Sequence, residues 1–240
     1  MSRTSPRAHV KQRLRTALKA AVPTAVGAKL HALFDDHARA GREAREQAMP
    51  RARLSERHVQ NCELLVDREA LLQRLPSGAA VAELGVDRGE FSGRILRATA
   101  PARLHLVDVW ASERYHDGLF EGVRAALDAE IRAGQVQIHR DTSLRAAARF
   151  DDASLDWIYV DTDHSYETTR DELAAYAPKV KPGGIIAGHD YVVGNWTQMY
   201  RYGVMEAVHE FCVARDWEIL YLTAVLTEKP SFAIRRIGAP

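Results

Sequence analysis

From residue 79 onward, short apolar runs alternate with longer segments of helical periodicity. The apolar runs are Ala80–Leu84, Leu104–Val109, Val136–His139, Leu155–Val160, Gly184–Ala187, Glu218–Leu222 and Phe232–Ile234. The helical patterns are Glu90–Thr99, Glu121–Ala133, Tyr166–Tyr176 and Val204–Ala214. This alternation predicts an α/β fold of repeated βαβ units, with a mostly parallel sheet covered on both faces by helices. Only a short turn near residues 227–230 separates the last two runs, so they are predicted to form an antiparallel hairpin.

The N-terminal third has a different pattern. Apolar residues recur at helical spacing between Val10 and Val22, and Pro23 predicts the end of that helix. A second helical pattern runs from Ser55 to Leu75 and is followed by Pro76-Ser77-Gly78. We therefore predict two parts, a basic helical extension over residues 1–75 and a Rossmann-like α/β domain over residues 76–240.

Charge separates the same two parts. Residues 1–58 carry 13 Lys and Arg against 5 Asp and Glu, whereas the remainder carries 20 against 27. The basic helix suits three roles: assembling an oligomer or covering the main domain, contacting an anionic membrane or glycolipid surface, or a disordered or targeting segment. The first is preferred, so a homo-oligomer is expected. Nucleic-acid binding is disfavoured because no aromatic residues interleave with the basic ones and no recognition motif follows.

Composition narrows the class of protein. The 240 residues are 46% hydrophobic and 27% charged, as in ordinary globular proteins. No uncharged apolar run reaches the roughly 20 residues that a transmembrane helix needs, and Lys19 and Lys29 interrupt the region where a signal peptide would lie. Cys62 and Cys212 are far apart and fit neither a disulfide framework nor a zinc finger. These features together predict a cytoplasmic protein.

The loop after the first predicted strand is the first candidate site, since open α/β sheets bind ligands beyond the carboxyl ends of their strands. It contains Gly85 and Gly89, which permit close backbone approach and a tight helix start. A dinucleotide fingerprint would expose amides to a pyrophosphate, but this loop carries acidic residues instead, Glu83, Asp87 and Glu90. Negative charge suits a ligand with ammonium and sulfonium cations, which is S-adenosyl-L-methionine.

The next two strand ends extend this site. Asp108 can accept hydrogen bonds from both ribose hydroxyls, and Trp110 offers a flat face for adenine. The third strand ends in Arg140-Asp141-Thr142-Ser143, where Asp141 or Ser143 could read the adenine edge. An aspartate at a strand end is also a common helix cap, so the order of these residues along one sheet is what favours cofactor binding.

Residues 79–211 resemble the class I S-adenosylmethionine-dependent methyltransferases. The resemblance rests on ELGVDRGEFS, LHLVDVW, DWIYVDTDHSYETTRDEL and KVKPGGIIAGHDY, blocks typical of the group known as methyltransferase domain 24. It implies a seven-stranded sheet with an antiparallel last strand, with Glu83, Gly85, Asp108 and Asp141 or Ser143 around the cofactor. Asp87 stands where most members have a second glycine.

Two further strand ends gather acidic and imidazole side chains. Asp161-Thr162-Asp163-His164 follows the fourth strand, and His189-Asp190 follows the fifth. Methyl transfer to oxygen needs a nucleophile that loses its proton, and an aliphatic hydroxyl does not ionise unaided at neutral pH. Either a general base such as His164 or a divalent cation could remove this barrier. Asp163 or Ser165 could instead cap the following helix.

The residues that follow the fourth and fifth strands, here called the rim, also resemble those of metal-dependent O-methyltransferases acting on macrolide sugars. That resemblance implies Asp161 or Asp163 together with Asp190 as ligands of a divalent cation, Mg²⁺ or Mn²⁺, and His164 as base. His189 replaces a glutamate there, and an imidazole suits Mn²⁺, Fe²⁺ or Zn²⁺ better than Mg²⁺. Asp161 is assigned to three roles, as a catalytic residue beside His164, as a cofactor-binding residue and as a metal ligand.

The long aromatic loop from Tyr191 to Tyr202 lies on the ligand side of the predicted sheet. Its aromatic rings could stack on a sugar, with Asn195, Gln198 and Arg201 orienting hydroxyls; alternatively they pack against the N-terminal helices. The sequence therefore predicts an S-adenosylmethionine-dependent methyltransferase acting on a hydroxyl of a sugar or other small molecule, with a glycolipid as one option. The alternatives are N-methylation or a non-catalytic binding module with a degenerate cofactor pocket.

Overall fold

The computed structural model describes residues 24–112, 116–197 and 199–238, and the side chains from residue 36 onward. Contacts divide the chain into two units, Met1–Met49 and Pro50–Pro240. The first unit contains one described helix, α2 (Thr24–Ala48). The helix expected between Val10 and Val22 lies outside the described residues.

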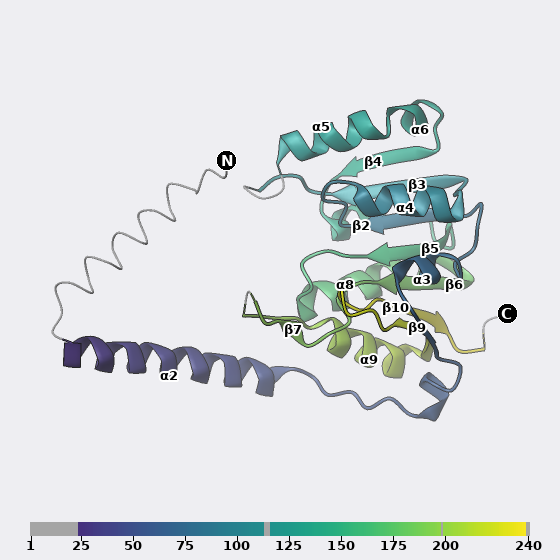
Figure 1. The fold of residues 1–240 in the computed structure, drawn as a ribbon. Coiled ribbons are helices and arrows are strands. Elements are labelled where there is room, and N and C mark those ends of the chain that lie inside the picture. The colour runs from purple at the N-terminus through teal and green to yellow at the C-terminus, as the bar shows by residue number, and fades with distance from the viewer. Residues whose placement is uncertain (1–23, 113–115, 198, 239–240) are drawn as a thin grey trace. The chain divides into compact units, whose positions relative to one another are not determined.

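The second unit is built on an eight-stranded sheet (Figure 1). Its strands are β1 (Glu63–Leu65), β2 (Ala80–Leu84), β3 (Arg103–Asp108), β4 (Val136–Arg140), β5 (Leu155–Val160), β6 (Val180–Gly188), β9 (Trp217–Thr223) and β10 (Phe232–Arg236). The strand order is β1-β9-β10-β6-β5-β2-β3-β4. Only β10 is antiparallel to its neighbours, β6 and β9, and the other pairs are parallel. The Rossmann-like fold and its closing antiparallel hairpin are thus confirmed.

Helices cover both faces of this sheet. They are α3 (Arg68–Leu72), α4 (Glu90–Thr99), α5 (Asp117–Ala126), α6 (Asp128–Arg132), α7 (Ser143–Ala146), α8 (Tyr166–Tyr176) and α9 (Val204–Arg215), with short 3₁₀ turns at Glu56–His58 and Ala147–Arg149. Because side chains alternate along a strand, each strand supplies two separate cores. Ala82 and Ile158 pack with α8 and α9 on one face, whereas Val81 and Trp157 pack with α3 and α4 on the other.

The segment from Ser55 to Leu75 differs from its prediction as one helix. It forms a 3₁₀ turn, the edge strand β1 and the five-residue helix α3. β1 pairs with β9 through Leu64 and Leu222, which makes it an eighth strand beside the seven expected. Tertiary pairing has overridden a helical spacing of apolar residues, and Val66, counted in that spacing, is exposed. Residues 50–75 therefore share the unit of the sheet, whereas the sequence pattern groups them with the N-terminal extension.

A membrane span is not found in the described part of the chain, because no helix there has the necessary length and apolar character.

Candidate functional site

The first strand-to-helix loop packs tightly against the end of β5. Gly85 has φ +87°, and a Cβ added there would lie 1.9 Å from the carbonyl oxygen of Asp161. No residue other than glycine fits such a contact with backbone. Gly89, with φ +75°, is the N-cap of α4 and leaves only 3.3 Å between an added Cβ and Val123. Both predicted glycines thus shape the loop itself, and Gly85 brings it to the carboxyl end of β5.

Asp108 holds this loop through its carboxylate. Its Oδ2 accepts hydrogen bonds from the amides of Val86 (2.9 Å) and Asp87 (3.0 Å), and its Oδ1 accepts one from the amide of Trp110 (3.1 Å). A carboxylate oxygen can accept two hydrogen bonds, so Oδ1 keeps capacity for one more donor. The residue expected to bind the ribose therefore also fixes the loop conformation.

The structure corrects the expected role of Trp110. Its side chain is fully buried, its indole Nε1 donates to the carbonyl oxygen of Asp87 at 3.0 Å, and its ring packs against Phe120. A ring with no exposed face cannot stack on adenine. Trp110 braces the loop instead.

Glu83 is buried beneath the loop and is 1% exposed. Ser92 donates a hydrogen bond to its carboxylate at 2.5 Å. Burial, partly offset by that hydrogen bond, raises the pKa of Glu83 to about 8. Glu83 is therefore mostly protonated at neutral pH and contributes little of the negative charge expected in this loop, which leaves Asp87 and Glu90 as its exposed or half-buried acidic residues.

This pKa predicts a pH-dependent stability. The unfolded chain loses the Glu83 proton near pH 4.5 and the folded chain near pH 8, so the unfolded state binds fewer protons between these values and stability falls as pH rises. Glu83→Gln should remove this fall. Its free energy of unfolding relative to wild type should increase from pH 5 to pH 8, by up to about 1.4 kcal/mol per pH unit, in urea denaturation. Glu90→Gln, at an exposed position nearby, is the control, and parallel profiles for Glu83→Gln and wild type would contradict the assignment.

The end of β4 carries the residues expected near the adenine edge. Asp141 forms ion pairs with Arg149 (3.1 Å) and Arg145 (3.3 Å), and the hydrogen bond from Arg149 lowers its pKa. Ser143 begins α7, and its carbonyl oxygen accepts a hydrogen bond from the hydroxyl of Tyr176 at 2.8 Å. Both lie at the edge of the sheet that carries Asp108, since β3 and β4 are parallel.

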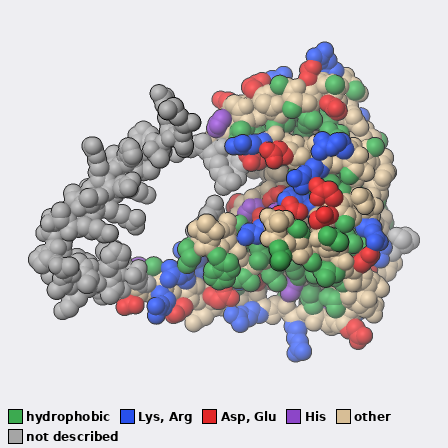
Figure 2. Space-filling model, viewed as in Figure 1, with side chains coloured by type: hydrophobic (Ala, Val, Ile, Leu, Met, Phe, Trp, Pro, Cys, Tyr) green, Lys and Arg blue, Asp and Glu red, His purple; other side chains and the backbone are tan. Residues whose placement is uncertain are grey.

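Asp161, His164 and Asp190 converge at the ends of β5 and β6. Each offers one ligand atom, and these three atoms lie within 4.8 Å of one another. Nε2 of His164 is 3.3 Å from Oδ2 of Asp190, and its Nδ1 is 4.0 Å from Oδ1 of Asp161. Figure 2 shows acidic, basic and histidine side chains gathered in a hollow on one side of the second unit.

His189 lies behind this cluster. Its Nδ1 is 3.3 Å from Oδ2 of Asp190 and 3.6 Å from Oδ2 of Asp161. Burial lowers its pKa, but the two carboxylates outweigh burial and raise the pKa to about 9. Its Nε2 is buried and has no hydrogen-bond partner among the described residues. Because Nδ1 faces both carboxylates, His189 orients them more readily than it adds a ligand atom.

Asp163, also expected as a ligand, lies outside the cluster. Its Oδ1 accepts hydrogen bonds from the amide and hydroxyl of Ser165, both at 2.9 Å, and its Oδ2 accepts one from Thr168. Ser165 in turn caps α8. The capping alternative therefore holds for this pair of residues.

The backbone conformation of the rim is unusual. His164 and Asp190 have φ values of +62° and +56°, a region that non-glycine residues seldom occupy. Glu172 of α8 anchors the same loop by accepting a hydrogen bond from Thr162 at 3.0 Å, and burial raises the pKa of Glu172 to about 7. The sequence gives no sign of this role, because Glu172 is one of several acidic residues in a segment with a helical pattern.

The aromatic segment after β6 forms a hairpin of β7 (Gly194–Asn195) and β8 (Tyr200–Arg201). Trp196 is 76% exposed and Tyr200 is 44% exposed. Tyr202 is buried, and its ring centroid lies 4.9 Å from that of His164. Gln198 lies outside the described residues. The segment thus places exposed aromatic rings, those of Trp196 and Tyr200, close in sequence to Tyr202, which contacts His164.

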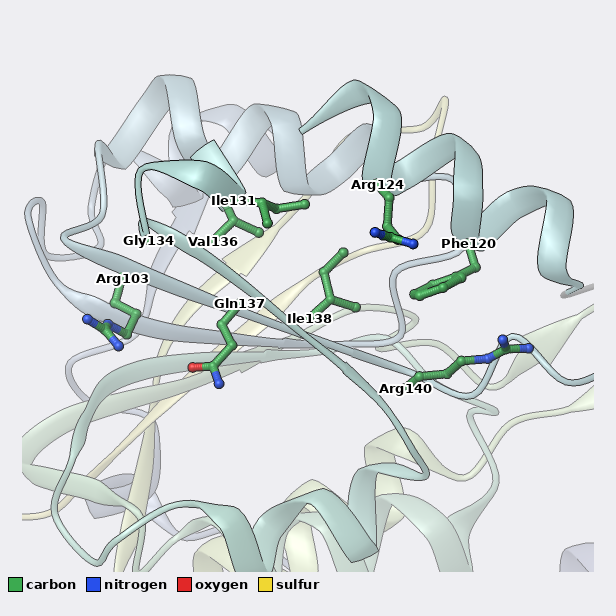
Figure 3. A pocket seen from close by; sticks show the side chains of 9 residues that line it. All are labelled: Arg103, Phe120, Arg124, Ile131, Gly134, Val136, Gln137, Ile138 and Arg140. Carbon is green, nitrogen blue, oxygen red and sulfur yellow. The ribbon is translucent and has the colours of Figure 1, made fainter. Parts of the chain in front are cut away.

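A groove of about 550 Å³ runs along the edge strand β4 and does not include the cluster (Figure 3). Phe120 and Arg124 of α5 point toward Ile138 of β4 across it. None of the predicted site residues lines this groove. A second cavity, of about 10 Å³, lies beneath His164 and His189 and could hold a single water molecule.

Comparisons with known proteins agree with the observed fold. Residues 82–191 match the family model of a methyltransferase domain. No curated protein matches the chain significantly. Solved structures with a similar fold include a candidate rRNA methylase from Clostridium thermocellum, 16% identical over 70% of this chain and 95% of that one, with a TM-score of 0.53.

Two further structures share the fold. One is a candidate methyltransferase from Streptococcus mutans in complex with SAH, 12% identical over 72% of this chain and 100% of that one, with a TM-score of 0.53. The other is a SAM-dependent methyltransferase from Aquifex aeolicus, 13% identical over 71% of this chain and 89% of that one, with a TM-score of 0.52. Residues 82–191, which include Gly85, His164 and Asp190, thus form a methyltransferase domain. The chain has a fold that S-adenosylmethionine-dependent methyltransferases share.

Proposed function

We propose that this enzyme methylates a hydroxyl group of a small molecule, and that Asp161, His164 and Asp190 activate that hydroxyl. The observation that supports the proposal is that these three side chains converge at one edge of the sheet. The loop between β2 and α4, here called the cofactor loop, ends at the same edge. An aliphatic hydroxyl needs such help, whereas a neutral amine is already nucleophilic. O-methylation therefore accounts for the cluster better than N-methylation does.

We further propose that the cluster holds a divalent cation. Two carboxylates and one imidazole form a donor set known from metal sites, and a mutual spacing within 4.8 Å allows all three to reach one ion after small side-chain rotations. This set suits Mn²⁺ or Fe²⁺ better than Mg²⁺, which prefers oxygen ligands. Asp161, His164 and Asp190 would hold the cation, which would supply Lewis-acid chemistry that makes an acceptor hydroxyl easier to deprotonate.

The protein's own residues would prepare this site. His189 holds both carboxylates from behind through Nδ1, which fixes their orientation. Gly85 brings the cofactor loop against the backbone of Asp161. The reacting methyl group and the acceptor oxygen can therefore meet beside the cluster, a positioning effect that supplies much of the rate in such transfers.

His164 as a general base is the alternative to His164 as a ligand. Asp190 could orient its ring through Nε2, which would leave Nδ1 to take the acceptor proton. The two roles differ in their need for metal, so removal of metal separates them.

The hairpin of β7 and β8 is proposed to bind the acceptor. Trp196 and Tyr200 present exposed aromatic faces, which stack well on the apolar faces of sugar rings. A sugar or glycoside is therefore the acceptor class to test first, with a glycolipid headgroup included in the panel.

Chelation tests the activation step. We expect the purified enzyme to form S-adenosylhomocysteine with at least one member of a panel of sugars and glycosides. Complete metal removal should reduce this rate by on the order of 10²-fold, and Mn²⁺ should restore more of it than Mg²⁺. Full activity without metal would assign activation to His164 as base, and absence of turnover with every hydroxylated acceptor would count against O-methylation.

The N-terminal unit is proposed to assemble the enzyme into a homo-oligomer, which the basic helical pattern suggests. Sedimentation of the full chain and of a chain beginning at Pro50 tests this, since the second unit starts there. An equal number of protomers in both would remove the proposal.

A further inference from the structure

Arg68 is the first residue of α3 and lies outside the matched methyltransferase segment. Its side chain is only 12% exposed. The guanidinium stacks over the ring of Phe91 in α4, with its Cζ 4.7 Å from the ring centroid. Arg68 is thus fixed at the carboxyl edge of the sheet, on the face that carries α3 and α4.

The hydrogen bonds of this guanidinium are incomplete. Nη2 donates to Oε2 of Glu228 at 3.1 Å, but Nη1 approaches Oδ2 of Asp161 only to 3.7 Å. Nε is buried and has no partner among the described residues. A buried donor without an acceptor is unfavourable, so we expect a bound molecule to supply acceptors to this guanidinium.

The position of Arg68 indicates which molecule this is. Asp161, its neighbour, has its backbone against Gly85 of the cofactor loop. One guanidinium flanked by two carboxylates is complementary to an α-amino acid, which carries one carboxylate and one ammonium group. S-adenosylmethionine ends in such a group, and its sulfonium must reach the same strand ends.

We propose that Arg68 binds the α-carboxylate of S-adenosylmethionine, while Glu228 and Asp161 face its α-ammonium group. This inference rests on the cofactor assignment, and it adds a subsite from a part of the chain that precedes the matched domain. A planar guanidinium can bind a carboxylate through two parallel hydrogen bonds, which fixes the orientation of the amino-acid end.

Changing both protein and ligand tests the contact. Binding of S-adenosylhomocysteine and of its decarboxylated analogue is measured by calorimetry for wild type, Arg68→Met and Arg68→Lys. Wild type should bind S-adenosylhomocysteine at least about 10-fold more tightly than the analogue. Arg68→Met should lose this preference because only the ligand with a carboxylate contacts Arg68, and Arg68→Lys should retain part of it.

Arg94→Met is the matched control. Arg94 forms an exposed ion pair with Glu69 between the same two helices, at 2.9 Å, so its loss should leave the preference unchanged. Equal weakening of both ligands by Arg68→Met, or no weakening, would overturn the inference. A wild type that binds S-adenosylhomocysteine poorly would instead overturn the cofactor assignment. Thermal melts without ligand identify any variant that fails to fold.

Discussion

Gly85→Ala is expected to lower the free energy of unfolding by about 2–5 kcal/mol. The left-handed backbone at φ +87° accounts for about 1–2 kcal/mol, and forcing apart the loop and the carbonyl of Asp161 accounts for about 1–3 kcal/mol more. The contact cannot relax through a side-chain rotation, because both partners are backbone. Urea denaturation followed by circular dichroism measures the change.

Gly134→Ala is the control for this experiment. Gly134 has a similar φ of +72°, but an added Cβ would meet no atom within 4 Å. Gly134→Ala should therefore lower the free energy of unfolding only through the left-handed backbone conformation, by about 1–2 kcal/mol. Equal losses in the two variants would show that the loop does not press against the end of β5.

Asp190→Asn is expected to lower turnover by on the order of 10²–10³-fold. The change removes the carboxylate that contacts both His164 and His189, while the side chain keeps its shape. Binding of Mn²⁺, followed by calorimetry, should weaken by at least about 10-fold. Turnover is measured as formation of S-adenosylhomocysteine with the best acceptor.

Asp163→Asn is the matched control for Asp190→Asn. Asp163 lies on the same rim and has been considered a ligand on sequence grounds, but it accepts its hydrogen bonds from Ser165 and Thr168. Its turnover should stay within about twofold of wild type. A loss as large as that of Asp190→Asn would mean that the loop rearranges to bring Asp163 to the ion.

Most strands and helices of the sheet domain could be predicted from the sequence, because the spacing of apolar residues shows which positions are buried. The strands Ala80–Leu84 and Leu155–Val160, and the helices Glu90–Thr99 and Tyr166–Tyr176, have the predicted bounds. Burial does not report pairing partners, so the Ser55–Leu75 segment was misassigned. Its apolar residues fit a helix equally well, and only β9 across the fold makes Glu63–Leu65 a strand.

The candidate site was predictable only as far as strand ends could be placed. Parallel strands bring Asp161 and Asp190 to one edge, which the sequence order implies. Side-chain direction depends on local backbone conformation, and the positive φ values of His164 and Asp190 have no sequence signal of the kind that glycine gives. Trp110 shows the same limit, since its burial depends on Phe120, a residue of a later helix.

The place of β10 between β6 and β9 has a consequence for biosynthesis. While the ribosome is still adding the residues before Phe232, the nascent chain holds two strands whose facing backbone groups have no partner. Such edges readily pair with other polypeptides, so a chaperone that shields newly made chains should raise the yield of active enzyme. The sheet can close only after residues 232–236 have left the ribosome and paired with β6 and β9, and this late, non-local pairing favours slow completion of folding.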